Sequence, residues 1–329
     1  MNVAILGATG AVGREMMKIL AERSFPVEEL RLLASPRSAG QKLLWQGREL
    51  TVQPAEDSAF EGMDIVLGAA ENDIAKRFAP AIVKAGAVFV DNSSAFRMDP
   101  NVPLVIPEIN PEDARRHKGI IANPNCSTIQ AVVALKPLYD TFGIKRIVYS
   151  TYQAVSGAGV AGYNDLKYGI EGRAPEKFPY PIAFNMLPHI DVFLDNGYTK
   201  EEWKMIEETK KILHDKSLRI TATTVRVPVY HGHSESINVE FKKPCTREAV
   251  FSCLSNFPGL VVMDDVKNNV YPMPILAENH DEVFVGRIRI DESVDSGVNI
   301  WCVADNIRKG AATNAVQIVE LLIKNATEA

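Results

Sequence analysis

Only four cysteines occur among the 329 residues, and no two of them form a Cys-x-x-Cys pair or a spacing typical of zinc ligands. The sequence therefore indicates neither a disulfide framework nor a structural zinc site, and we expect reduced thiols in a cytosolic protein. Long apolar runs are also missing, because none approaches the roughly 20 residues of a membrane span. Met1 leads directly into a strand pattern, which leaves no space for a signal peptide, so we expect a cytoplasmic location.

A surplus of positive charge is missing as well. The net charge is −5, and the lysines and arginines are scattered, so no basic surface for nucleic acid is indicated. Hydrophobic residues make up 46% of the chain and charged residues 23%, which is typical of an ordinary globular protein. A chain of this length has enough material for two domains with separate cores.

The most informative stretch is the one around Cys126. A short apolar strand precedes it, and Pro124 ends that strand because it disfavours helical backbone at Asn123. Asn125 is a good N-cap, so a helix is predicted to begin at Cys126. The unpaired N–H groups of a first helical turn favour a thiolate near neutral pH. Cys126 is therefore either a nucleophile or a buried structural cysteine, and the local pattern does not decide between them.

The N-terminus has the pattern of a nucleotide-binding turn. An apolar strand at 2–6 is followed by a glycine turn and then by a helical stretch at 14–22. In a dinucleotide-binding fold, the backbone N–H groups of such a turn receive the pyrophosphate. The spacing is Gly-x-x-Gly-x-x-Gly and not the generic Gly-x-Gly-x-x-Gly, so a simple tight turn is the alternative. The turn consists of Gly7, Ala8, Thr9, Gly10, Ala11, Val12 and Gly13.

The second predicted strand, at 30–34, bears on the choice of cofactor. An NAD site would place an acidic residue after this strand to bind the ribose 2′-hydroxyl. The chain instead carries Ser35, Arg37 and Ser38, which suit the 2′-phosphate of NADP. A solvated loop arginine is the alternative interpretation.

The pattern of predicted strands and helices differs between the first and the second part of the chain. Strands and helices alternate up to about residue 122, including a helix at 72–84 and a short strand at 104–106, and predict a doubly wound parallel sheet. From residue 145 onward, β-rich segments with interposed helices and a flexible turn at 153–159 predict an α+β domain with a mainly antiparallel sheet. An amphipathic last helix, at 311–324, has an apolar face that suits packing on the first domain.

Several isolated groups are candidates for chemistry. Arg97 follows the carboxyl end of a predicted strand, where it faces either a ligand or solvent. His231 and His233 are too few for a metal site, and His233 is better motivated as an acid or base beside Cys126. Arg226 lies seven residues earlier, and strand alternation places it on the opposite face, although turn residues disturb that period.

On helical phase alone, one further charged pair looks unimportant. Glu208 and Lys211 lie three residues apart on the polar face of a predicted helix at 200–214. That face is the one away from Trp203, so a solvated surface pair is the simplest interpretation.

Five motifs in this order resemble one family. They are Gly-Ala-Thr-Gly-Ala-Val-Gly (7–13), Asn-Ser-Ser-Ala-Phe-Arg (92–97), Asn-Pro-Asn-Cys-Ser-Thr (123–128), Gln-Ala-Val-Ser-Gly (153–157) and Arg-Val-Pro-Val-x-x-Gly-His-Ser (226–234). The chain is similar to the aspartate-semialdehyde dehydrogenases along nearly its whole length. The cysteine motif and the Arg…His motif together are highly specific, whereas the glycine turn alone is not.

The resemblance implies a role for each motif residue. Cys126 would be the nucleophile, His233 the acid/base, and Gln153 would orient the reacting group. Arg226 would bind the substrate α-carboxylate and Glu208 the α-ammonium. Phosphate would be bound by Arg97, Asn125 and Lys211. The cofactor would be held by Gly7, Thr9, Gly10, Ala11, Val12, Gly13, Ser35, Arg37, Ser38, Ser156, Gly157 and Asn306.

The resemblance also implies an overall organisation. Residues 1–126 with 307–329 would form a Rossmann-type NADP-binding domain, to which the last helix returns. Residues 127–306 would form the catalytic and dimerisation domain. The expected assembly is a homodimer or a dimer of dimers, without a metal, a nucleic acid or a membrane as partner.

The implied reaction converts L-4-aspartyl phosphate to L-aspartate 4-semialdehyde and inorganic phosphate. It uses NADPH and a thioester on the cysteine, in lysine (diaminopimelate), threonine and methionine biosynthesis. One alternative is N-acetyl-glutamyl-phosphate reductase, which shares the Cys–His plan but handles an acylated amine. Another is an NADP-binding regulatory homologue without catalysis, whose mark would be loss of the cysteine.

Overall fold

The computed structural model describes residues 1–328, and the chain divides into two compact units. The first unit comprises Met1–Pro124 and the residues from Ala311 onward, and the second is Asn125–Gly310. The observed division falls near the predicted boundaries at 126 and 307, but it places Cys126 in the second unit. No helix among residues 1–328 is long and apolar enough to cross a membrane.

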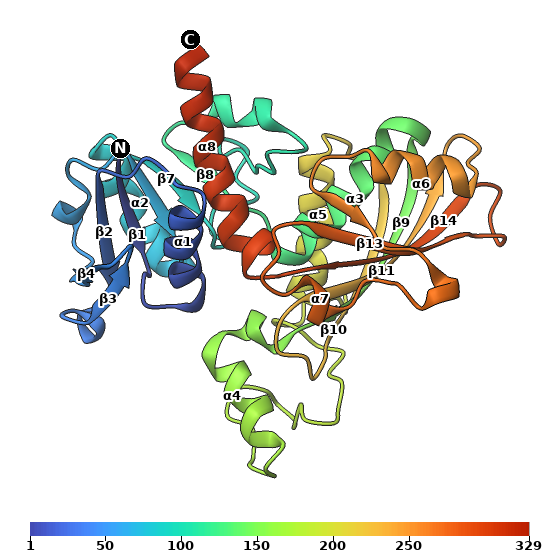
Figure 1. Cartoon of the computed structure of the whole chain (residues 1–329), viewed down its shortest axis with the longest axis horizontal. Helices are drawn as coiled ribbons and strands as arrows, with labels where there is room; N and C mark the ends of the chain where they lie inside the picture. Colours follow the sequence, from blue (N-terminus) through green and yellow to red (C-terminus); the bar gives the residue numbers. More distant parts are fainter. Residues whose placement is uncertain (329) are drawn as a thin grey trace. The chain divides into compact units, whose positions relative to one another are not determined.

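The first unit is built on a six-stranded sheet in which every neighbouring pair is parallel (Figure 1). Its central strands are mostly apolar and buried, as a parallel sheet covered on both faces requires. The predicted doubly wound sheet is therefore confirmed. In spatial order the strands are β5 (Gln53–Pro54), β2 (Glu29–Ala34), β1 (Asn2–Leu6), β6 (Ile65–Gly68), β7 (Val88–Asp91) and β8 (Ile120–Ala122).

Helices pack on both faces of this sheet and form a hydrophobic core with each face. Helix α1 (Ala11–Glu22) and helix α8 (Thr313–Glu328) contribute to one cluster, and α2 (Asn72–Lys84) contributes to the other. The last helix therefore packs within the first unit, beside α1 (Figure 1). Short 3-10 turns lie at Pro36–Ser38, Asp57–Phe60 and Pro111–Arg116, and a π-helical stretch at Arg308–Ala312 precedes α8.

Two details of this unit differ from the sequence predictions. A hairpin of β3 (Lys42–Trp45) and β4 (Arg48–Thr51) was not predicted. Its turn residues, Gln46 and Gly47, both have positive φ, as a two-residue hairpin turn requires, but Gln at the first position hides this signal. The strand predicted at 104–106 is only an isolated bridge from Leu104 to β8.

The second unit is built on a mixed six-stranded sheet. The β9–β11, β11–β14 and β13–β14 pairs are antiparallel, whereas β9–β10 and β12–β13 are parallel. The expected mainly antiparallel sheet is confirmed. In spatial order the strands are β10 (Arg219–Arg226), β9 (Ile144–Gln153), β11 (His233–Phe241), β14 (Gly297–Ala304), β13 (Val283–Ile290) and β12 (Leu260–Val262).

Helices α3 (Cys126–Phe142), α5 (Lys200–Ile212) and α6 (Arg247–Ser255) pack together on one face of this sheet. The hydroxyl of Tyr149 in β9 lies 3.1 Å from that of Thr209 in α5, which identifies the covered face. Because strand side chains alternate, Tyr152, Ser236 and Trp301 lie on the opposite face, where they are only partly buried.

Helix α4 (Gly159–Gly169) was missed by the sequence analysis, which predicted only a turn near 153–159. Glycines at 159, 162 and 169 disguise the helix, because glycine is a poor helix former. Asp165 ties the next loop to it by accepting hydrogen bonds from the backbone N–H groups of residues 176–178. The remaining short elements are α7 (Pro274–Ala277) and 3-10 turns at Val155–Ala158 and Val266–Asn268.

Candidate active site

Cys126 lies at the first position of α3, as the sequence predicts. The side-chain oxygen of Asn125 caps the helix by accepting hydrogen bonds from the N–H groups of Ser127, at 3.0 Å, and Thr128, at 3.2 Å. This cap makes the helix begin at the cysteine. A Cβ added to Gly310 would lie 2.9 Å from the Cβ of Cys126. A larger residue at 310 would therefore displace the cysteine. The sequence analysis did not identify this requirement for glycine at 310.

His233 begins β11 and is completely buried. Its Nδ1 accepts a hydrogen bond from the backbone N–H of Ala154 at 3.0 Å, so the neutral ring carries its proton on Nε2. Burial and the Arg226 guanidinium lower the pKa of His233 to about 3, and the Glu201 carboxylate opposes that shift. A Cβ on Gly157 would lie 3.3 Å from Nε2, so glycine keeps side-chain bulk away from this nitrogen.

Gln153, Arg226 and His233 lie at one edge of the sheet. Gln153 ends β9 and Arg226 ends β10, and the two residues are paired across the parallel strands. His233 begins β11, the antiparallel neighbour on the other side of β9. The sequence left open whether Arg226 and His233 lie on one extended segment, because turn residues separate them. A turn containing Gly232, at φ +84°, places them on separate strands.

Arg226 is buried, with 5% of its surface exposed. Its Nη1 donates to the carbonyl oxygen of Ala154 at 2.6 Å, and its buried Nε has no hydrogen-bond partner among the described residues. Burial lowers the pKa of Arg226, whereas the charges of Glu201 and Cys126 raise it. A guanidinium fixed at one nitrogen and unpaired at another is suited to bind a carboxylate.

The prediction that Glu208 is a solvated surface residue is wrong. Glu208 is 1% exposed, and its Oε2 accepts a hydrogen bond from the N–H of Asn125 at 2.7 Å. Trp203, which the helical pattern placed on the buried side, is 41% exposed. The face was misread because Glu201 and Glu208, two turns apart, are both buried carboxylates. Lys211 on the same helix is half-buried.

Two residues that the resemblance assigned to cofactor binding contact each other in the second unit. The Oδ1 of Asn306 accepts a hydrogen bond from the hydroxyl of Ser156 at 3.2 Å and from the N–H of Gly232 at 3.0 Å. These contacts fix the Asn306 amide beside the start of β11. Gly157, the third such residue in this unit, adjoins Ser156 and lies against the imidazole of His233.

In the first unit, the glycine turn between β1 and α1 is tightly folded. Gly7 has φ +93°, and its N–H donates to the carbonyl of Leu33 at 2.8 Å. A Cβ on Gly13 would lie 2.4 Å from the carbonyl oxygen of Gly7, so only glycine permits this approach. No side chain caps α1 at its N-cap, Gly10. The N–H groups at this helix start therefore suit a pyrophosphate, through residues 7–13.

The segment after β2 also fits the predicted cofactor. Ser35 and Arg37 are exposed and Ser38 is partly exposed, on the 3-10 turn that follows the strand. The turn carries no carboxylate that would repel a 2′-phosphate.

Arg97 also belongs to the first unit, and the interpretation of it as a surface arginine is wrong. It is 7% exposed, its Nε donates to the carbonyl of Asn123 at 2.9 Å, and its Nη2 donates to the carbonyl of Asn92 at 2.9 Å. Burial raises the pKa of neighbouring Asp91, while Ser93 and Arg97 oppose that shift.

Two family models match the chain. The model described as semialdehyde dehydrogenase, NAD binding domain, matches residues 2–117, and the one described as semialdehyde dehydrogenase, dimerisation domain, matches residues 135–309. Aspartate-semialdehyde dehydrogenases from Aquifex aeolicus and Synechocystis are 58% and 53% identical to this chain. The alignments cover 98% of this chain in both cases, and 98% and 97% of the relatives.

The chain belongs to the aspartate-semialdehyde dehydrogenase family.

Solved structures agree with this conclusion. Aspartate-semialdehyde dehydrogenase II from Vibrio cholerae, complexed with ASA, matches with a TM-score of 0.95 and 48% identity over 98% of both chains. The Candida albicans enzyme with NADP matches with a TM-score of 0.76 and 28% identity over 98% of both chains. The predicted family, two-domain α/β fold and dehydrogenase class are confirmed, and the first unit is a nicotinamide-dinucleotide-binding domain.

Sequence reasoning missed Glu201, whose carboxylate lies within hydrogen-bond distance of both Asn125 and Gln153. Lying outside the recognised motifs, it gave no signal except its place just after the N-cap Thr199. In the part of the chain that the structure describes, no group of three His, Cys, Asp or Glu is placed to hold a metal. His231 instead lies 3.9 Å from Glu278.

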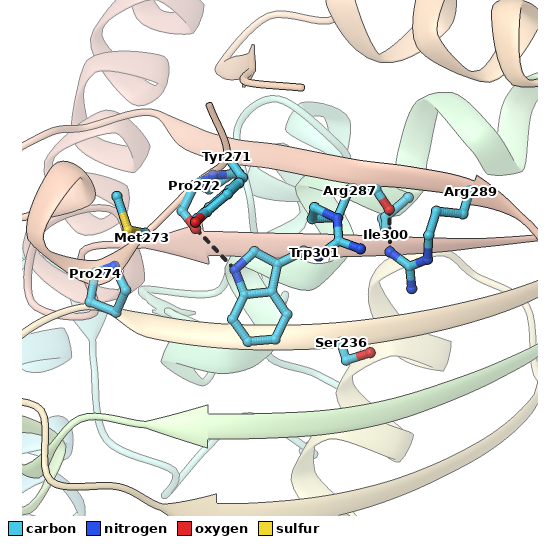
Figure 2. A pocket seen from close by; sticks show the side chains of 9 residues that line it. All are labelled: Ser236, Tyr271, Pro272, Met273, Pro274, Arg287, Arg289, Ile300 and Trp301. Atoms are coloured by element: carbon cyan, nitrogen blue, oxygen red, sulfur yellow. Dashed lines mark hydrogen bonds between the residues drawn. The ribbon is translucent and has the colours of Figure 1, made fainter. Parts of the chain in front are cut away.

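A pocket of about 350 Å³ in the second unit is separate from these residues (Figure 2). It lies on the sheet face away from α3, where the Trp301 indole donates to the carbonyl of Pro272 at 3.1 Å. Arg287 and Arg289 lie on one side of it, and none of the candidate catalytic residues lines it.

Proposed function

We propose that this chain converts L-4-aspartyl phosphate and NADPH to L-aspartate 4-semialdehyde, phosphate and NADP. The observation that carries the proposal is the position of Cys126 at a helix start in the same unit as Arg226, His233 and Gln153. Glu201 accepts hydrogen bonds from both Asn125, next to Cys126, and Gln153, which is paired with Arg226, so these residues lie in one part of the unit. Relatives of this name at more than half identity support the same conclusion.

Cys126 would begin the reaction as the nucleophile. Its Sγ attacks the acyl carbon of the aspartyl phosphate, the S–C bond forms, and the C–O bond breaks as phosphate leaves with the electron pair. The resulting thioester is a better hydride acceptor than the acyl phosphate. Backbone N–H groups at the start of α3 suit the oxyanion that develops during this step.

The bound cofactor supplies the hydride that reduces the thioester carbon, after which the thiohemiacetal releases the aldehyde and restores the thiol. The glycine turn 7–13, with its uncapped α1, fits the pyrophosphate, and Arg37 with Ser35 and Ser38 fits a 2′-phosphate. The preference for NADP over NAD therefore rests on Arg37. Ser156, Gly157 and Asn306 are our proposed cofactor-binding residues in the second unit.

His233 would manage the proton at the substrate oxygen. Because its Nδ1 accepts the Ala154 N–H, the neutral ring presents a donor at Nε2, directed at the space that Gly157 keeps clear of side-chain bulk. The neutral ring can donate a hydrogen bond from Nε2 to the oxygen as charge develops there. To take up a proton at Nε2, the ring must first release the Ala154 contact and carry its proton on Nδ1.

Arg226 and Glu208 would recognise the amino-acid end of the substrate. The partly unpaired guanidinium of Arg226 suits the α-carboxylate, and the buried carboxylate of Glu208 suits the α-ammonium. N-acetyl-glutamyl phosphate has no cation for Glu208, which argues against the alternative reductase. Arg97, Asn125 and Lys211 are our proposed phosphate-binding residues.

We also propose that the chain forms a homodimer and acts in the cytoplasm. A second copy of the chain would cover the open face of the sheet in the second unit, within the region that matches a dimerisation domain. The mechanism needs Cys126 as a reduced thiol, which a reducing compartment such as the cytoplasm preserves. The product would enter lysine, threonine and methionine biosynthesis, including the diaminopimelate branch.

One assay tests this function: phosphate-dependent formation of NADPH from L-aspartate 4-semialdehyde. Cys126→Ala should abolish turnover while NADP binding persists, because the thiol and the glycine turn are separate sites. Residual activity within about tenfold of wild type would refute the covalent mechanism. Faster turnover of N-acetyl-glutamate semialdehyde would favour the alternative reductase, and no turnover of either aldehyde would favour the regulatory homologue.

A further inference from the structure

Glu201 is the second residue of α5, and only 5% of its surface is exposed. The helix start is fixed by a capping box, in which Thr199 and Glu202 exchange hydrogen bonds between side chain and backbone. Glu201 therefore projects from a rigid position in a first helical turn, where a negative charge is favoured.

One oxygen of Glu201 holds two amides of the candidate active site. Its Oε1 accepts hydrogen bonds from the Nδ2 of Asn125 at 2.9 Å and the Nε2 of Gln153 at 3.1 Å. These contacts decide how each amide is turned. The Asn125 oxygen is left to cap α3, and the Gln153 oxygen accepts from the Thr151 hydroxyl at 3.0 Å. Turning either amide over would set its oxygen against the carboxylate.

The other oxygen of Glu201 keeps the carboxylate ionised. Its Oε2 accepts from the Nζ of Lys204 at 3.0 Å, and the same Nζ donates to Asp191 at 2.8 Å. Burial raises the pKa of Glu201, but Lys204 and the two amides outweigh it and bring the pKa to about 2. The amides are therefore held by an anion at neutral pH, which makes stronger hydrogen bonds than a neutral acid.

We propose that Glu201 is a positioning residue, which orients the amides of Asn125 and Gln153 for the reaction at Cys126 without touching a reacting atom. This inference rests on the proposed function, because it assumes that the thioester forms on Cys126. Holding one N–H of Gln153 leaves the second N–H to face the substrate. Holding Asn125 keeps its oxygen on the N–H groups that start α3 at the cysteine. A small displacement of such groups lowers the rate more than it weakens substrate binding.

The test replaces Glu201 by the isosteric, uncharged Gln. Glu201→Gln should lower kcat about ten- to a hundredfold, because two charge-assisted hydrogen bonds are lost. The KM for the semialdehyde should stay close to its wild-type value. The Tm should fall, because ionised Glu201 also stabilises the fold through Lys204. Tyr149→Phe is the control for stability, since it removes the buried contact of 3.1 Å between the hydroxyls of Tyr149 and Thr209 on the same helix. It should lower the Tm and leave kcat near the wild-type value.

A double-mutant cycle separates positioning from a general structural effect. If Glu201 acts in part through Gln153, then Glu201→Gln should lose much of its effect on kcat in a Gln153→Ala background. Full additivity of the two changes would overturn the role. Should Glu201→Gln fold poorly, Lys204→Gln releases the second carboxylate oxygen and should lower kcat by a smaller factor, whereas an unchanged kcat would contradict the proposal.

The outcome for wild type keeps the two proposals apart. Wild-type protein without phosphate-dependent semialdehyde oxidation overturns the proposed function, and the role of Glu201 falls with it. Active wild type with an unchanged kcat in Glu201→Gln overturns only the positioning role.

Discussion

His233 is the residue whose environment has the clearest consequence for pH. Its pKa in the folded protein is about 3, below the ordinary value near 6.5, so the unfolded chain binds the proton first as the pH falls. Stability is therefore lost from about pH 6.5 downward, at up to about 1.4 kcal/mol per pH unit. His233→Gln should abolish this dependence, which urea unfolding of both proteins from about pH 7 to about pH 5 would measure.

The difference between the two proteins is the quantity that matters in that measurement. Glu201, with a pKa of about 2, also loses stabilisation in acid, but it does so equally in wild type and variant. Parallel stability curves for His233→Gln and wild type would show that His233 is protonated as readily in the folded state as in the unfolded chain.

Individual residues also show which positions in the candidate site can be predicted from the sequence. The Asn-Pro-Asn-Cys order contains a strand end, a cap and a helix start, so the position of Cys126 follows from local rules. Glu208 and Glu201 could not be placed in this way, because helical phase cannot distinguish a buried carboxylate with partners from a solvated one. Their burial depends on Asn125 and Gln153, which only the fold brings near.

At the scale of elements, two requirements conflict at the turn between β1 and α1. Helix propensity favours a residue with a side chain, whereas the close backbone contact requires glycine. Gly13 lies inside α1, where alanine would favour the helix by about 1 kcal/mol. A Cβ there would meet the carbonyl oxygen of Gly7 at 2.4 Å, and backbone cannot yield as a side chain can. Overpacking typically costs about 1–3 kcal/mol, so we expect Gly13→Ala to lower the Tm and weaken NADPH binding, measured by thermal shift and cofactor fluorescence.

Gly10 provides the control for that turn. Its Cβ would lie 3.4 Å from the same oxygen, so Gly10→Ala should lower the Tm much less than Gly13→Ala. Equal losses in the two variants would mean that the close approach is not what constrains the turn.

The elements that the sequence predicted are those with strong local signals. Strand β1 and helix α2 were found at their predicted bounds, the helix in spite of Pro80 within it. Helix α4 and the β3–β4 hairpin were missed because their own residues oppose them, with glycines in the helix and glutamine in the turn. In these segments, tertiary contacts such as those of Asp165 override local preference.

At the scale of the whole molecule, the open face of the second unit's sheet predicts the assembly. The rings of Tyr152 and Trp301 lie there with centroids 5.5 Å apart and planes tilted by 44°, and Ser236 pairs with Trp301 across the strands. A stable interface needs about 800 Å² from each partner, and a broad, partly apolar sheet face can supply it. The wild-type mass in solution, measured by sedimentation equilibrium, should therefore be that of at least two chains.

A charge on this face should separate the copies. Ser236→Glu would bury a carboxylate without a partner in the proposed interface, so we expect the mass to fall to that of one chain. Ser252→Glu, on the exposed side of α6, introduces the same charge away from the sheet face and should leave the assembly intact. A wild-type protein with the mass of one chain would refute the dimer. If Ser236→Glu stays associated, the copies meet through a different surface, and the open face requires another explanation.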